Sequence, residues 1–98
     1  MKSQPEVEAL RAVSKLAFGH TYRLELMLAI LDSDDGICTL SELAASLDVS
    51  VSSIQLPLES LVELGMLMPI PVGDTRYRHY IRNDDIGWAW ARQLASRI

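Results

Sequence analysis

Apolar residues recur at the spacing of an amphipathic helix in five stretches of the chain. Ser3 and Glu6 form a capping box before the first stretch, and Thr39 and Glu42 form another before the third. Gly19 ends the first stretch, as expected of a residue that tolerates a left-handed backbone. The pattern predicts helices at about 4–18, 21–31, 40–47, 50–65 and 85–97.

Two β-prone segments lie between the last two predicted helices. Residues 66–71 and 75–83 flank Gly73-Asp74, a pair that favours a tight hairpin turn, and residues 37–39 predict a brief third strand. Prolines confine segment 66–71 to the edge of a sheet. Alternation along the second hairpin strand predicts an inward face of Tyr77, His79 and Ile81 and an opposite face of Arg76, Arg78 and Arg82.

The predicted order is helix, helix, strand, helix, helix, strand, strand, helix. Two helices joined by a tight turn and followed by a hairpin form a helix-turn-helix with a wing. We therefore predict a mainly α fold with a small β-hairpin, a winged helix-turn-helix, in a single domain over 1–98.

Composition narrows the class of protein. The 98 residues carry a net charge of −4 and one cysteine, so no internal disulfide can form and bulk charge does not attract nucleic acid. No apolar run reaches the roughly 18 residues of a membrane span, and the amino-terminal sequence does not read as a secretory signal. We expect a cytoplasmic protein with no membrane association.

Three segments carry a resemblance to a known family: RLELMLAIL at 23–31, TLSELAASLDVSVSSI at 39–54, and LVELGMLMPIPVGDTRYRHYIRND at 61–84. With these segments the chain resembles the ArsR-type winged helix-turn-helix transcriptional regulators. The resemblance implies a homodimer built from the first and last helices (about 4–18 and 85–97) that binds a palindromic operator in double-stranded DNA.

Neither a metal site nor an enzyme active site can be drawn from the residues. Many ArsR-type regulators hold a metal through paired thiolates or His/Asp clusters, but this chain offers only Cys38, His20 and His79, which are scattered. We expect Cys38 to be a small buried residue, His79 to be a core histidine bonded to backbone, and no cofactor to be present. No nucleophile, base and acid set stands out, so we predict a non-enzymatic protein.

The helix at 50–65 is the predicted DNA-reading helix. Ser52, Ser53 and Gln55 match the family's contacting positions in type, since glutamine bonds an adenine edge and serine hydroxyls bond phosphate or base. The wing arginines Arg76, Arg78 and Arg82 are expected to bind phosphates or a narrow minor groove.

The same helix also departs from the family pattern. It contains no Lys or Arg, and Leu56 and Pro57 stand where basic or polar residues are usual. A proline at that depth either kinks the helix or divides it. Two interpretations stay open: local packing, or a surface at Leu56 and Pro57 that binds another protein in a module that has lost most DNA affinity.

The first and last helices carry more apolar residues than one small core can easily cover, which is typical of an interface. A ligand pocket lined by Trp88 or Trp90 is the alternative. The residues predicted to form the dimer interface are Val7, Leu10, Val13, Trp90 and Leu94.

Overall fold

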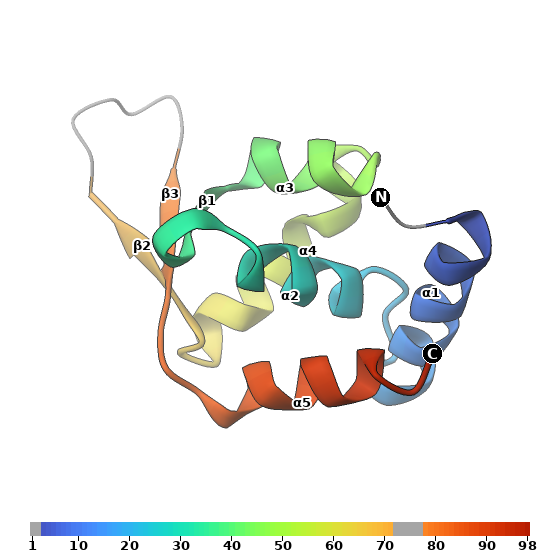
Figure 1. Cartoon of the computed structure of the whole chain (residues 1–98). Coiled ribbons are helices and arrows are strands. Elements are labelled where there is room, and N and C mark those ends of the chain that lie inside the picture. The colour runs from blue at the N-terminus through green and yellow to red at the C-terminus, as the bar shows by residue number, and fades with distance from the viewer. Residues whose placement is uncertain (1–2, 72–77) are drawn as a thin grey trace.

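A computed structural model describes residues 3–71 and 78–98, so the predictions made for Gly73, Asp74, Arg76 and Tyr77 lie outside the described residues. The order of elements is the predicted one (Figure 1). The helices are α1 (Gln4–Phe18), α2 (Arg23–Leu31), α3 (Leu40–Leu47), α4 (Val51–Glu63) and α5 (Ile86–Ala95), and the strands are β1 (Ile37–Thr39), β2 (Leu67–Ile70) and β3 (His79–Arg82).

Side-chain caps begin three of the helices where the sequence placed them. The backbone N–H of Glu6 donates to Ser3 Oγ at 3.3 Å, and that of Glu42 donates to Thr39 Oγ1 at 3.2 Å. Asp85, one of two candidates, caps α5 by accepting from Gly87 N at 2.8 Å. These bonds satisfy amides that have no partner inside the helix, which is why the boundaries could be predicted from local sequence.

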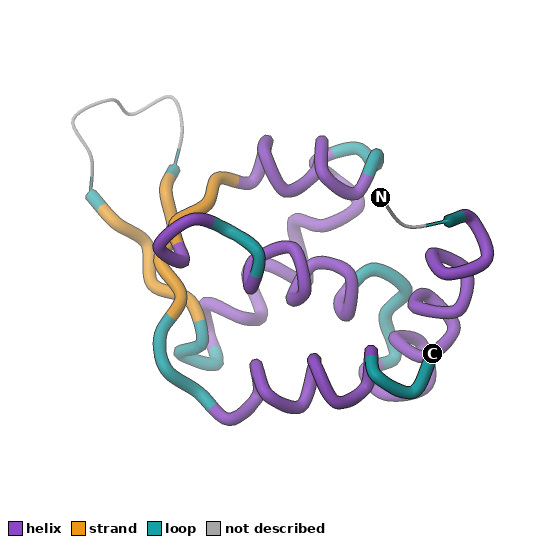
Figure 2. The backbone as a smooth tube through the Cα atoms, in the orientation of Figure 1, coloured by secondary structure: helices purple, strands orange, loops and turns teal. Residues whose placement is uncertain are grey.

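The three strands form one antiparallel sheet with the order β1-β3-β2. Cys38 pairs with Tyr80 across β1 and β3, and Pro69 lies on β2 at a sheet edge, as predicted. The strands gather at one end of the molecule, while both termini lie on the opposite side (Figure 2).

The predicted facing of β3 was wrong. Tyr80 is the buried residue of this strand, whereas His79 and Ile81 are only partly buried. The ring of Tyr80 belongs to the hydrophobic core, so its face also carries Arg78 and Arg82. Nor is His79 bonded to backbone, because its Nδ1 is buried without a hydrogen-bond partner among the described residues.

Helix α2 runs through the centre of the core and contacts all four other helices. Leu24, Leu26 and Ile30 of this helix are fully buried. Leu10 of α1 and Leu94 of α5 are 4% and 6% exposed and pack in the same core, so their assignment to a dimer interface was wrong. An amphipathic stripe marks positions that avoid water and does not say whether the cover is the chain itself or a partner.

Polar contacts fix the junction of α1 and α2. Ser14 is fully buried, and its hydroxyl donates to the carbonyl of His20 and accepts from Leu24 N at 3.0 Å. Nearby, Arg11 Nε donates to Glu25 Oε1 at 2.6 Å, which pairs an almost buried carboxylate. Two buried backbone groups and one buried charge are thereby satisfied. None of the helices within 3–71 and 78–98 combines the length and the apolar character that a membrane span requires.

Candidate nucleic-acid interface

Helices α3 and α4 form a helix-turn-helix. The turn at 48–50 begins with Asp48 in the left-handed conformation (φ 56°), where its N–H bonds the carbonyls that end α3. Ile54, Leu58 and Leu61 bury one side of α4 against the core. The opposite side is therefore the face that α4 presents to a binding partner.

Pro57 lies on the buried side of α4. The helix continues through this residue as one element, and Pro57 is among the fully buried side chains. Ser60 Oγ donates to the Pro57 carbonyl at 2.7 Å. The proposed Leu56 and Pro57 surface was thus wrong for Pro57, and Leu56 alone is exposed, at 73%.

The polar residues predicted to contact DNA lie along the amino-terminal half of α4. Ser52 and Gln55 are exposed and Ser53 is partly buried. Ser50 Oγ lies 3.0 Å from Ser52 Oγ and 2.8 Å from Ser53 Oγ, so this hydroxyl binds its neighbours instead of capping the helix. Gln55 Nε2 donates to Glu59 Oε1 at 3.4 Å, one turn along the same face.

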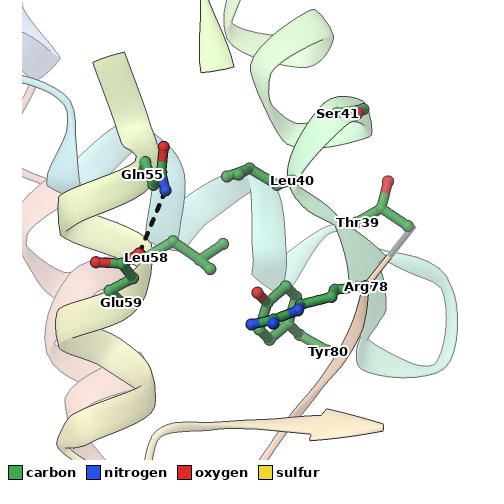
Figure 3. A pocket seen from close by; sticks show the side chains of 8 residues that line it. All are labelled: Thr39, Leu40, Ser41, Gln55, Leu58, Glu59, Arg78 and Tyr80. Carbon is green, nitrogen blue, oxygen red and sulfur yellow. Dashed lines mark hydrogen bonds between the residues drawn. The ribbon is translucent and has the colours of Figure 1, made fainter. Parts of the chain in front are cut away.

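A groove of about 380 Å³ joins this half of α4 to the wing (Figure 3). Gln55 and Glu59 line one wall, and Arg78 and Tyr80 from the wing line another. Thr39, at the start of α3, contributes to the third side. Two residues predicted from separate parts of the sequence, Gln55 and Arg78, therefore meet at one site.

Arg82 does not belong to this site, contrary to the prediction. Its Nη1 donates to the carbonyls of Ile30 at 3.3 Å and Leu31 at 3.2 Å, which ties the sheet to the carboxyl end of α2. Arg23 is similarly engaged, since its guanidinium bonds Ser60 Oγ and lies 5.8 Å from the ring centre of Phe18. Both arginines hold elements of the fold together.

The charge on this surface is uneven. The segment 40–63 contains no Lys or Arg and four acidic residues: Glu42, Asp48, Glu59 and Glu63. Arg78 supplies positive charge to the groove. Attraction for a phosphate backbone is therefore concentrated on the wing, and α4 presents uncharged and acidic groups.

A second surface lies on the outer sides of α1 and α5. Trp90 is 44% exposed and packs edge-on against Phe18 with ring centres 5.1 Å apart, while Val7 and Val13 are partly buried. Leu16 and Ile86 are both 87% exposed. The sequence prediction missed these two because their helical spacing placed them with the core-facing stripes.

Cys38 and the two histidines do not form a metal site. Within the part of the chain that the structure describes, no three His, Cys, Asp or Glu side chains are grouped so as to hold a metal ion. Cys38 is buried on β1, and burial raises the pKa of its thiol to about 11. His20 Nδ1 instead accepts from Tyr22 N at 3.2 Å at the junction of α1 and α2.

These features define the fold as a winged helix-turn-helix, and comparison with known proteins supports that class. No protein-family model matches the sequence, and no curated protein matches it closely enough to indicate a relationship. The structure is similar to apo MarR of Escherichia coli (TM-score 0.68, 20% identity, covering 95% of this chain and 67% of MarR).

Two Streptomyces coelicolor regulators of the MarR family give comparable results. AbsC has a TM-score of 0.67 at 17% identity, covering 96% of this chain and 64% of AbsC. A second regulator, solved in complex with DNA, has a TM-score of 0.63 at 18% identity, covering 94% and 66%. The chain thus spans about two thirds of the length of these proteins. The similarity establishes the winged-helix fold and does not single out the ArsR type.

Proposed function

We propose that the protein is a winged-helix transcriptional regulator that binds double-stranded DNA. The observation that carries the proposal is the meeting of Gln55 and Arg78 in one groove, beside the exposed face of α4. Support comes from the fold, since E. coli MarR was solved with operator DNA and an S. coelicolor relative with DNA. The listed structures are of transcriptional regulators, which favours regulation over catalysis.

In this proposal the two parts of the site have different tasks. Helix α4 enters the major groove with Ser52, Ser53 and Gln55, and the wing binds the phosphate backbone through Arg78 and the predicted contact Arg76. Each phosphate neutralised contributes about −0.9 to the slope of log affinity against log salt. Two wing arginines from each of two protomers would therefore give a slope of about −3.6. A DNA-binding role also implies a cytoplasmic location.

We further propose a homodimer that binds a palindromic operator through two copies of α4. The outer sides of α1 and α5 offer the contact, with Leu16 and Trp90 in place of the buried Leu10 and Leu94. Val7 and Val13 stay in the proposal as partly buried flanking residues. The narrower ArsR-type assignment, without a metal site, rests on the motifs at 39–54 and 61–84 alone.

A second candidate function is a protein-binding module. Leu56 is 73% exposed in the middle of the α4 face, and the helix-turn-helix lacks basic residues. An apolar side chain on an acidic surface fits a basic protein partner as well as it fits a groove in DNA.

A salt titration separates the two functions. Fluorescence anisotropy with a mixed-sequence duplex at two salt concentrations should show affinity that falls steeply with salt. Arg78→Ala should weaken binding and reduce the slope, whereas Arg92→Ala, an equal charge change on the exposed side of α5, should not. Binding that is absent, or equally affected by both variants, would favour the protein-binding function.

The dimer is tested by sedimentation equilibrium. Leu16→Glu should dissociate it, because the change places a charge in the proposed interface. Leu64→Glu is the matched control, since Leu64 is also exposed (64%) but lies at the end of α4. Equal association of the two variants would contradict the proposed interface.

A further inference from the structure

The inference concerns which bases α4 reads, and it rests on the proposed DNA-binding function. Leu56 is the most exposed apolar residue of α4, at 73%. It lies on one ridge with Ser52, four residues before it, and Glu59, three residues after it. An apolar side chain thus stands at the centre of the face that would enter the major groove.

The surroundings of Leu56 argue against self-association as the explanation for its exposure. Glu59 and Glu63 lie along the same ridge, and no basic residue occurs from 40 to 63. Packing two copies of this face together would bring like charges into contact. Gln55, the neighbour of Leu56, lines the groove that Arg78 enters from the wing, so the ridge is continuous with the proposed DNA site.

We propose that Leu56 recognises the C5 methyl group of a thymine in the major groove. Among the groups that base pairs expose there, this methyl is the one apolar group, and leucine has no polar atom with which to read any other. The rest of the edge consists of hydrogen-bond donors and acceptors.

The two polar neighbours select the same kind of base pair. Glu59 is an acceptor, so it can bond the amino group of cytosine or adenine, and it opposes the O6 and N7 acceptors of guanine. Gln55 donates its amide to Glu59 at 3.4 Å, which orients the carboxamide and leaves its oxygen to accept from an adenine amino group. Guanine is usually read by Arg or Lys, which α4 lacks. The half-site should therefore carry adenine and thymine, and exclude guanine from the strand edge that faces Glu59.

The test begins with selection of binding sites from a random duplex pool, followed by replacement of each selected thymine with deoxyuridine, which lacks only the methyl group. One replacement should weaken binding about fourfold, the equivalent of about 0.8 kcal/mol for one buried methyl group. Leu56→Ala should bind the thymine and uracil duplexes equally. Leu64→Ala, the same substitution at an exposed leucine at the end of α4, should still discriminate.

The outcomes distinguish the inference from the proposed function. If the chain binds duplex DNA with a steep salt dependence but no thymine can be replaced with loss, the thymine contact is refuted and DNA binding stands. If Leu56→Ala and Leu64→Ala lose discrimination together, the contact does not belong to Leu56 and the inference is overturned. If no salt-dependent binding occurs, both proposals fail. Circular dichroism confirms folding of each variant before titration.

Discussion

The two wing arginines that the structure describes should respond to mutation in opposite ways. Arg82 holds the last carbonyls of α2, and α2 has no basic residue of its own in that turn. Arg78 is exposed and lines the groove beside α4. We therefore predict that Arg82→Ala lowers stability and spares DNA affinity, and that Arg78→Ala does the reverse.

The magnitude follows from the contacts of Arg82. Hydrogen bonds from charged donors contribute about 1.5–3 kcal/mol when short and buried. The two bonds here are 3.2 and 3.3 Å long from a partly exposed side chain, so we assign about 1 kcal/mol to each. A cation at a helix carboxyl end adds about 0.3–1 kcal/mol. Arg82→Ala should reduce the free energy of unfolding by about 2 kcal/mol and Tm by about 10 °C.

Urea denaturation followed by far-UV circular dichroism measures the stability of both variants. Arg78→Ala should change the free energy of unfolding by less than about 0.5 kcal/mol, as is usual for an exposed side chain. Arg82→Lys should recover part of the loss, because an ammonium retains the charge but not the planar fork. Anisotropy titrations at a temperature where every variant is folded then measure DNA affinity.

The reasoning would be refuted if Arg82→Ala matched the wild type in stability while losing as much DNA affinity as Arg78→Ala. Arg82 would then be a phosphate contact, and its bonds to α2 would contribute nothing measurable. A loss of both stability and affinity in Arg78→Ala would equally contradict the division of tasks within the wing.

Three further predictions concern buried groups. Ser14→Ala should lower the free energy of unfolding by about 2–4 kcal/mol in urea denaturation, because it leaves a carbonyl and an N–H buried without partners. Arg11→Ala should cost about 2 kcal/mol by leaving Glu25 unpaired, and the double variant Arg11→Ala/Glu25→Leu should recover most of that loss in the same assay; additive losses would contradict the pairing. Cys38 should react with a thiol reagent at pH 8 only after urea is added, since burial raises its pKa to about 11. Its contribution to stability should be complete below the unfolded thiol pKa of about 8.5 and decline as pH rises toward 11, which a pH series of urea melts would check.

The parts of the fold that depend on local chemistry could be predicted from the sequence. Thr39 caps α3, Asp85 caps α5 and Gly19 adopts the left-handed conformation (φ 72°) that ends α1, each by interactions within a few residues. The order of elements follows from these boundaries, and a helix-turn-helix followed by strands leaves few other architectures.

The errors arose where a pattern has two solutions that only packing can distinguish. Strand alternation divides β3 into two faces, and the preference of Tyr80 for the core selected the face that also carries Arg82. Helical periodicity grouped Leu10 and Leu16 together, although the first is 4% exposed and the second 87%. The partner of Arg82 lies about fifty residues away in the sequence, so no local signal could have revealed it.

The hydroxyl of Ser14 has a consequence for how such a protein can change its partners. Because this one side chain bonds both the end of the α1–α2 loop and the start of α2, the angle between the two helices is set from inside the molecule. Substitutions on the outer side of α1, at Leu16 for example, can then accumulate without tilting the helix. Evolution is free to exchange the surface that docks while the frame that carries it keeps its shape.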